Sequence, residues 1–260
     1  MERLITINDA VTEIDWIFDY ATILTGSIFA VVLALLIGFA IKYRERPGHK
    51  AHYTRGDSPA AVRMSIALAL LVFFGVDISL AYFDHHAFLE LYSDPPSQDE
   101  ATVVDVFAKQ FEWNFAQAGS DGEMGTDDDI FSINTLTVPT GKPVLVRMRS
   151  LDVLHSFFIP YTRGKQDVLP GMTTAFWFDP DKTTAQARAE LGDPEFEYEI
   201  ACAELCGLGH TTMRGTMTVL TPEEFAAWQA EESANAANFD MPEIWWDWSL
   251  DPADYAEEGE

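Results

Sequence analysis

Cysteine and positive charge are both scarce in this sequence. Of 260 residues, only two are cysteine and 16 are lysine or arginine, against 42 aspartates and glutamates, so the formal net charge is −26. An acidic balance of this size excludes binding of nucleic acid through a basic face. The C-x-x-C-H motif that attaches haem in cytochromes of the c type does not occur, so the chain has no such haem to supply electrons internally.

Two further signals are missing. Residues 1–16 contain no basic segment followed by an apolar core, so we expect no cleaved signal peptide. The Gly- and Asp-rich segment 118–129 lacks the EF-hand spacing of calcium ligands. Its composition favours a solvated hairpin loop over a calcium site.

Long apolar runs are present near the N-terminus. Residues 21–41 contain no charge, and residues 64–83 are interrupted only by Asp77. A helix of about 20 apolar residues crosses the roughly 30 Å hydrocarbon core of a bilayer. One such run also fits a buried helix of a soluble protein, but two runs flanking a basic loop favour a membrane hairpin. We therefore expect spans at about 17–43 and 62–83.

The loop between the two runs sets the expected orientation. Six of the 16 basic residues lie between positions 42 and 63, and the positive-inside rule makes this loop cytoplasmic. Both termini then face outward. Residues 84–260 carry 34 acidic and 9 basic residues, so this acidic part is expected outside, in the periplasm or its equivalent. The chain would be a multi-pass protein of the cell (plasma) membrane.

Asp77 is an ionisable residue inside an expected span. Such a residue is costly and is by default a functional hypothesis. It could face a neighbouring subunit and join a path for protons or hydrogen bonds. The alternative, which we favour, is an ordinary hydrogen bond between helices or a position close enough to the outer surface to reach water.

Both cysteines fall in one short stretch together with a histidine and a methionine. Cys202, Cys206, His210 and Met213 follow the spacing C-x3-C-x3-H-x2-M. Thiolate, thioether and imidazole ligands select copper or zinc over hard cations, and the glycines between them favour a loop wrapped around an ion. Methionine is a poor zinc ligand, which favours copper. A disulfide, a structural zinc site and simple core packing remain alternatives.

A second histidine, His155, follows a short apolar run and opens the segment H-S-F-F-I-P. The segment K-Q-D-V-L-P-G begins ten residues later, at Lys165. Two membrane spans, an aromatic segment, these two motifs and the ligand stretch occur in this order along the chain. Together they resemble subunit II of the haem–copper oxidases, the cytochrome c oxidase subunit that carries the binuclear copper centre CuA.

The resemblance implies a ligand set for two copper ions. By position, the ligands are His155, Cys202, Cys206, His210 and Met213, with the backbone carbonyl of Glu204 as the sixth. The family also uses the glutamate between the cysteines, here the Glu204 side chain, to hold magnesium at the boundary with subunit I. No catalytic nucleophile or general base is expected.

Electrons are expected to enter through an aromatic segment. Phe111, Trp113 and Phe115 alternate along a predicted strand and so share one face, either as core or as a surface for a donor. The family usually has Q-W-x-W here, so Phe111 replaces the first tryptophan and Trp113 matches the second. The E-x-x-W-T-like segment before the family's second span is replaced by G-D-S-P at residues 56–59, so a role in proton uptake is not carried over.

The remaining pattern predicts a membrane-anchored all-β protein. Short apolar runs separated by turns are typical of a sandwich or small barrel, and the resemblance implies a cupredoxin-like Greek-key domain. Residues 183–192 are expected to form a short helix, and Thr221 with Pro222 begins another that ends near residue 237. The expected parts are a transmembrane helical hairpin (1–90), an extracytoplasmic CuA domain (91–222), and a C-terminal helix with an acidic aromatic tail (223–260).

The tail after residue 237 contains Trp245, Trp246 and Trp248 and only acidic charges. Exposed aromatic side chains of this kind suggest docking on another subunit. Packing back on the chain's own domain is the alternative, and both remain open.

These expectations combine into one function. The chain accepts electrons from cytochrome c, or a similar small redox donor, at CuA and passes them to haem in subunit I, where oxygen is reduced to water and protons are translocated. It would act in the membrane with subunit I and other oxidase subunits. The alternatives are a CuA subunit of a nitric oxide reductase and a zinc- or disulfide-stabilised membrane scaffold. The negative charge of residues 84–260 either attracts a basic electron donor or keeps the protein surface solvated at high salt.

Overall fold

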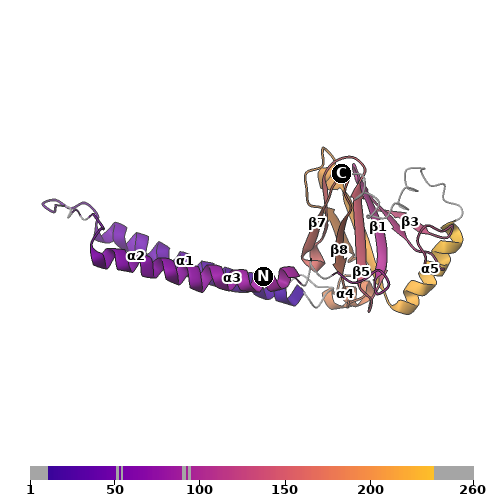
Figure 1. The fold of residues 1–260 in the computed structure, drawn as a ribbon, viewed down its shortest axis with the longest axis horizontal. Helices are drawn as coiled ribbons and strands as arrows, with labels where there is room; N and C mark the ends of the chain where they lie inside the picture. The colour runs from indigo at the N-terminus through magenta and orange to yellow at the C-terminus, as the bar shows by residue number, and fades with distance from the viewer. Residues whose placement is uncertain (1–10, 51–52, 54, 90–91, 93–94, 237–260) are drawn as a thin grey trace, which may run out of the picture. The chain divides into compact units, whose positions relative to one another are not determined.

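The computed structural model describes residues 11–50, 53, 55–89, 92 and 95–236, which fall into two compact units (Figure 1). Residues 12–93 form a helical hairpin, and residues from 94 onward form a β domain. The expectations for residues 1–10 and for the tryptophan-rich tail lie outside the described residues.

The hairpin consists of two long helical segments joined by the basic loop. Ser58 begins the second segment, because its Oγ accepts the Ala61 N–H at 3.2 Å and Pro59 occupies the first turn. Both segments are long and apolar enough to cross a membrane, as predicted. The elements are α1 (Val11–Lys42), α2 (Pro59–Val72), the π-helical η1 (Phe73–Asp77) and α3 (Ile78–Phe88).

The two helices contact each other at the end away from the loop. The rings of Trp16 and Phe83 meet edge to face with centroids 4.7 Å apart, and Tyr20 packs on Phe83 at 5.6 Å. The Tyr20 hydroxyl lies 2.9 Å from Ser79 Oγ. Most other apolar side chains of the hairpin are exposed within this unit, as expected for surfaces that meet lipid or another protein.

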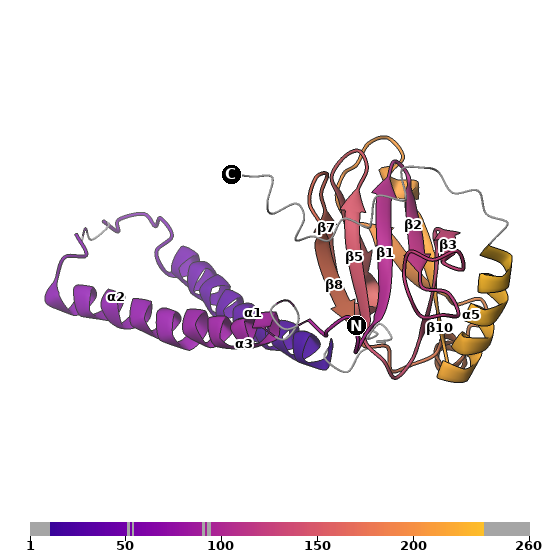
Figure 2. The same ribbon diagram turned by 45° about the vertical axis from the view of Figure 1, so that its right-hand side comes forward.

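The β domain is a sandwich of two five-stranded sheets (Figure 2). Its strands are β1 (Thr102–Lys109), β2 (Glu112–Gln117), β3 (Ile130–Ile133), β4 (Thr135–Pro139), β5 (Val144–Ser150), β6 (His155–Ile159), β7 (Gly164–Val168), β8 (Thr174–Phe178), β9 (Tyr198–Cys202) and β10 (Arg214–Leu220). One sheet has the order β3-β2-β1-β5-β8 and the other β4-β10-β9-β6-β7. β1 pairs in parallel with β5, and β4 with β10, while the other neighbouring strands are antiparallel.

Apolar side chains from the facing sheets fill the core. Trp113 and Phe115 from β2 are fully buried, as is Phe157 from β6 in the opposite sheet. The Trp113 and Phe157 rings meet edge to face, with centroids 5.2 Å apart. Packing of this kind gives the sandwich a rigid interior.

Two short helices complete the domain where the sequence predicted them. α4 (Thr184–Leu191) begins with a reciprocal capping box between Thr183 and Gln186 and ends at Gly192, which has a φ of +66°. α5 (Pro222–Ala236) begins with a similar box, in which Thr221 and Glu224 exchange hydrogen bonds of 3.0 and 3.3 Å. α5 packs on β3, β4 and β10.

The acidic segment 118–129 is a loop between the antiparallel strands β2 and β3, as predicted. Its carboxylates accept hydrogen bonds from backbone amides of the same loop. Asp121 accepts Glu123 N–H at 2.9 Å, and Asp129 accepts Gly125 N–H at 2.7 Å. These bonds give the aspartates a local structural role.

Candidate metal centre

Four loops meet at one end of the sandwich, which we name the ligand end. β1 and β5 run in parallel with Ala108 opposite Ser150, so the β1–β2 turn and the β5–β6 loop leave the sheet side by side. A bridge between Ser150 and Pro170 adds the β7–β8 turn. Gln110 Nε2 donates to the Cys206 carbonyl at 2.5 Å, which adds the β9–β10 loop.

The β9–β10 loop holds four of the five expected ligand side chains. The two ends of this loop are joined by a hydrogen bond from the Cys202 N–H to the Met213 carbonyl, at 3.2 Å. Gly207 has a φ of +129°, and a Cβ on Gly209 would lie 2.5 Å from the Phe111 ring. Glycine is therefore required for the backbone to turn back and to pass close to this ring.

Strand pairing brings the fifth ligand to this loop. Phe157 of β6 lies opposite Cys202 of β9, so His155, two residues earlier on the same face of β6, projects beside the loop. Ala203 N–H continues the contact by donating to the Ser156 carbonyl at 2.9 Å. The antiparallel register thus places His155 beside Cys202, although they are far apart in the sequence.

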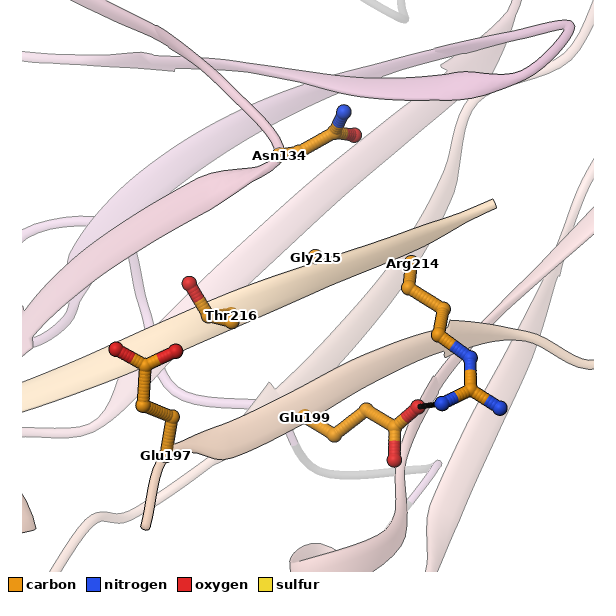
Figure 3. A pocket seen from close by; sticks show the side chains of 6 residues that line it. All are labelled: Asn134, Glu197, Glu199, Arg214, Gly215 and Thr216. Carbon is orange, nitrogen blue, oxygen red and sulfur yellow. Dashed lines mark ion pairs between the residues drawn. The ribbon is translucent and has the colours of Figure 1, made fainter. Parts of the chain in front are cut away.

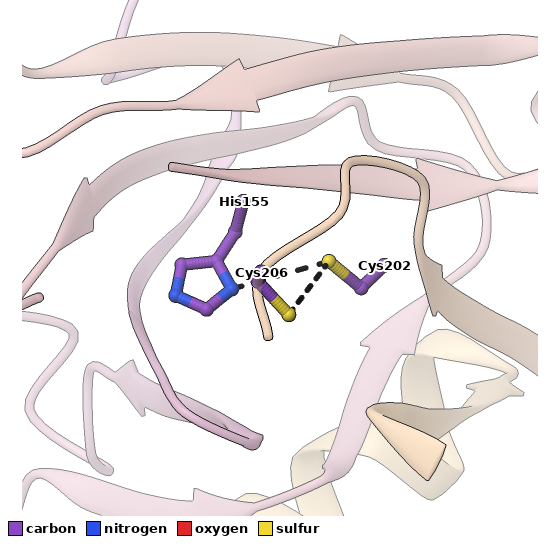
Figure 4. A group of neighbouring side chains, drawn as sticks. All are labelled: His155, Cys202 and Cys206. Carbon is purple, nitrogen blue, oxygen red and sulfur yellow. Dashed lines mark hydrogen bonds between the residues drawn. The ribbon is translucent and has the colours of Figure 1, made fainter. Parts of the chain in front are cut away.

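The five side chains lie close together, and Figure 4 shows three of them, His155, Cys202 and Cys206. The two Sγ atoms, of Cys202 and Cys206, lie 3.8 Å apart, and His155 Nδ1 lies 3.9 Å from the first of them. His210 Nδ1 and Met213 Sδ each lie 3.7 Å from Cys206 Sγ. The ligand atoms of His155 and the two cysteines all fall within 4.8 Å of one another.

The sulfur geometry fits a shared metal better than a disulfide. Both Cys202 and Cys206 are free thiols, and their 3.8 Å separation far exceeds the roughly 2.05 Å of an S–S bond. Two metal–sulfur bonds of about 2.3 Å can span this separation, so one ion can contact both sulfurs. The thioether of Met213, only 1% exposed, favours copper over zinc as that ion.

The protein environment prepares one thiolate. Burial raises the pKa of Cys202, but hydrogen bonds from His155 and from backbone groups of Ser156 and Glu204 outweigh it and lower the pKa to about 6. Burial and the neighbouring Cys202 raise the pKa of Cys206 to about 11. Without metal at neutral pH, the pair thus holds one negative charge, which attracts a cation.

Asp152 is a functional residue that sequence reasoning missed. Its Oδ1 lies 2.8 Å from His155 Nε2, the ring nitrogen that faces away from the cysteines. Burial lowers the pKa of His155, but hydrogen bonds to Cys202 and Asp152 outweigh it and hold the pKa above its ordinary value. A carboxylate on the far nitrogen fixes the tautomer and orientation of a metal-binding histidine.

Gln110 was also missed as part of the site. Its backbone N–H donates to Asp152 Oδ2 at 2.7 Å, and its side chain holds the Cys206 carbonyl. One residue thus ties the carboxylate behind His155 to the loop that carries the cysteines. The family motif drew attention to the aromatic residues that follow Gln110, and no spacing rule links it to position 152 or 206.

Glu204 has different surroundings for its backbone and its side chain. The Cys202 thiol donates to the Glu204 carbonyl at 3.2 Å, so this oxygen lies at the edge of the ligand cluster. The residue is exposed. The carbonyl is therefore available to the cluster, while the carboxylate is accessible to another ligand or protein.

The two aromatic residues expected to receive electrons have unlike positions, which corrects the prediction of a shared aromatic face. Trp113 is fully buried behind the site, with its ring 6.1 Å from that of His155. Phe111 is 36% exposed and lies in the β1–β2 turn, outside the strand. Period-two alternation fails because the chain turns before β2 begins. Only Phe111 lies at the surface.

Exposed apolar side chains gather at the ligand end, and we name this group the apolar rim. They come from all four loops that meet there. Leu208 is fully exposed and Leu205 is 75% exposed, although both flank buried Cys206. Apolar groups of this kind mark interaction surfaces. The apolar rim consists of Phe111, Leu151, Leu154, Met172, Leu205 and Leu208.

A separate hollow on β9 and β10 has different chemistry (Figure 3). Arg214 and Glu199 form an ion pair at 3.0 Å across it. Its lining contains no cysteine, histidine or methionine; the residues are Asn134, Glu197, Glu199, Arg214, Gly215 and Thr216. This hollow therefore lacks the sulfur and imidazole groups that would bind a soft metal.

Comparison with known proteins agrees with this site. Residues 116–219, which include every expected ligand, match the family described as "Cytochrome C oxidase subunit II, periplasmic domain". The chain is 28% identical over 254 residues to the "Alternative cytochrome c oxidase subunit 2" of Bradyrhizobium diazoefficiens, covering 88% of this chain and 81% of the relative. It is 27% identical over 239 residues to "Cytochrome c oxidase subunit 2" of Alkalihalophilus pseudofirmus, covering 90% and 63%.

A solved structure is similar to the β domain. The periplasmic domain of cytochrome oxidase subunit II of Bradyrhizobium japonicum aligns with 23% identity and a TM-score of 0.44, covering 55% of this chain and 99% of that one. The family match spans the ligand set, and the two relatives match 88% and 90% of the chain. Residues 116–219 therefore belong to the cytochrome c oxidase subunit II family as its periplasmic cupredoxin domain, and the chain as a whole is similar to subunit 2 of the haem–copper oxidases.

Proposed function

We propose that this chain receives electrons at a binuclear copper centre and passes them to haem in the large subunit of a cytochrome c oxidase. The observation that carries the proposal is the convergence of two thiols, two imidazoles and a buried thioether at the ligand end. Soft donors in this combination fit copper. Two copper ions held by shared thiolates would supply a one-electron carrier.

The chain's own residues hold this centre and limit its movement. His155, Cys202, Cys206, His210 and Met213 provide side-chain ligands, and Glu204 provides its carbonyl. Asp152 and Gln110 fix these groups to two other loops. A site fixed to a rigid sandwich needs little rearrangement when its charge changes, which suits electron relay.

The surroundings suggest where partners bind. The apolar rim provides a surface beside the ligands for a small redox donor such as cytochrome c, with Phe111 as its aromatic member and Trp113 behind it. The exposed Glu204 carboxylate could hold magnesium against subunit I. Oxygen reduction and proton translocation belong to subunit I in this proposal.

The proposed placement follows the charge pattern. Both termini and the copper domain lie outside the cell (plasma) membrane, and the basic loop lies in the cytoplasm. The helical hairpin (1–90) anchors the copper domain (91–222), which continues into the helix and tail (223–260). The described part of the last segment, α5, packs on three strands of the sandwich.

Metal analysis of the full-length chain tests the proposal. We expect two copper ions per chain and the purple absorption of a mixed-valence centre, and both should be lost in a Cys202→Ser/Cys206→Ser variant. One zinc ion, or a disulfide in the native protein, would overturn the proposal in favour of a membrane scaffold. Turnover of the purified complex with oxygen or with nitric oxide as acceptor distinguishes an oxidase from a nitric oxide reductase.

A further inference from the structure

An ionisable side chain, Asp77, lies where the second membrane helix changes from π back to α geometry. The π segment η1 ends at this residue, and the Ile78 N–H bonds back to the Phe73 carbonyl, five residues earlier. π turns inside helices are rare and occur frequently at functional sites. The position therefore combines an unusual backbone with an unusual side chain for a membrane span.

The hairpin itself supplies hydrogen bonds beside the π turn. Ser79 Oγ lies 2.9 Å from the Gly75 carbonyl and 3.0 Å from the Val76 carbonyl, and the Tyr20 hydroxyl of α1 lies 2.9 Å from Ser79 Oγ. Hydroxyl groups satisfy backbone carbonyls that lipid cannot. This polar contact identifies the side of the helix that faces α1.

Asp77 lies away from that side. It is exposed within the hairpin, whereas Val76 and Ser79 are half-buried. In the part of the chain that the structure describes, its carboxylate has no hydrogen-bond partner. The half-buried stripe of the second helix consists of Val76, Ser79, Leu80 and Phe83.

Asp77 lies inside the apolar stretch 64–83. The next charged residue toward the β domain is Asp84, seven residues later and close to the same helix face. At 1.5 Å per residue, Asp77 lies about 10 Å farther into the apolar stretch 64–83 than Asp84. Ionisable residues at such depth almost always face protein or a water-filled cavity, because exposure to lipid is costly.

We propose that Asp77 is an assembly contact that accepts a hydrogen bond, within the membrane, from a basic or hydroxyl side chain of the large haem–copper subunit. The inference rests on the proposed function, which provides this partner subunit. One side of the second helix packs on α1 through Ser79, and the neighbouring side presents Asp77 to the partner. The π turn sets the angle between these two sides.

Copurification of the full-length complex in mild detergent tests this contact. For Asp77→Leu, we expect the amount of large subunit recovered per tagged chain, read from haem content, to fall about tenfold, the effect of one interhelical hydrogen bond. Asp77→Asn keeps an acceptor oxygen and should recover most of the large subunit. Asp84→Leu is the matched control, since it removes a carboxylate from the same face near the membrane surface, and it should behave as the native chain.

Two outcomes would overturn the proposal. One is native recovery of the large subunit with Asp77→Leu. The other is Asp77-dependent association of two differently tagged copies of this chain without the large subunit, which would make the partner a second copy. Copper absorption of each variant shows whether the β domain is intact. If the native chain binds no copper but still assembles in an Asp77-dependent manner, the proposed copper function is rejected and the Asp77 contact stands.

Discussion

Asp152 Oδ1 and His155 Nε2 lie 2.8 Å apart, so the imidazole is held by one nitrogen while the other faces Cys202. Asp152 is itself fixed by the backbone amides of Gln110 and Val153, at 2.7 and 2.6 Å. Burial raises the pKa of Asp152, but these hydrogen bonds outweigh it and lower the pKa below its ordinary value. The carboxylate therefore stays ionised and oriented at neutral pH.

Replacing Asp152 by alanine should weaken copper binding about 10- to 100-fold, the usual effect of removing such a partner from a metal-binding histidine. His155 then loses the group that fixes its tautomer. Competition with a copper chelator measures the change. Asp167→Ala, which removes an exposed carboxylate on the neighbouring strand β7, is the control. Equal affinity in the Asp152 and Asp167 variants would contradict the role of Asp152.

Replacing Met213 by leucine should shift the reduction potential and alter the mixed-valence spectrum while the domain stays folded. The thioether is buried 3.7 Å from Cys206 Sγ, and leucine preserves its volume at a cost usually below about 1.5 kcal/mol. Both thiolates remain in place. Potentiometry with thermal unfolding separates the two effects; an unchanged potential and spectrum would remove Met213 from the site.

The metal-free protein should show two distinct thiol titrations. The pKa of Cys202 is lowered to about 6 and that of Cys206 is raised to about 11. Since the thiolate is the reactive form, alkylation of Cys202 should increase as pH rises through 6, whereas Cys206 should stay unreactive until strongly alkaline pH. Mass spectrometry after timed alkylation reads each cysteine. Equal rates at neutral pH would show that the environment does not distinguish them.

Replacing Leu208 by serine should slow electron transfer from the donor without changing stability. Leu208 is fully exposed, so its loss should alter the free energy of unfolding by no more than about 0.5 kcal/mol. Removing an apolar contact from the rim should raise the donor's KM. Leu191→Ser on α4, an exposed leucine outside the rim, is the control.

The same assay distinguishes apolar docking from electrostatic steering. Acidic residues are spread over the 118–129 loop, the α4 region and α5, and they also adjoin the apolar rim at Glu112, Asp152 and Glu204. We therefore expect electron transfer to depend weakly on ionic strength. A steep fall between low and moderate salt would show that charge guides a basic donor instead.

The sequence predicted the parts of the site that depend on local spacing. Cys202, Cys206, His210 and Met213 lie within twelve residues, so their order alone indicated a shared ion. The helix start at Thr221 was predicted for the same reason, because an N-cap residue followed by proline is a local pattern.

Features that depend on distant contacts were missed or misjudged. Gln110 joins the site through its contact with Asp152, 42 residues later, and no periodicity reports such a pair. Phe111 was placed on a strand face with Trp113 because alternation was continued through a turn. The π turn before Ile78 was not predicted either, since its sequence is as apolar as the α-helix around it.

The pairing of Phe157 with Cys202 also sets the order in which this centre can mature. His155 reaches the cysteines only after β6 and β9 have joined, so the complete donor set does not exist in the unfolded chain. Because the donor set forms only in the folded domain, the free energy of metal binding would add to the free energy of unfolding. The apolar core between the sheets includes Cys206 and Met213 among its packed residues. Folding of the core thus places two of the proposed ligands, so a metal ion delivered to the folded domain would meet donors that already hold their positions.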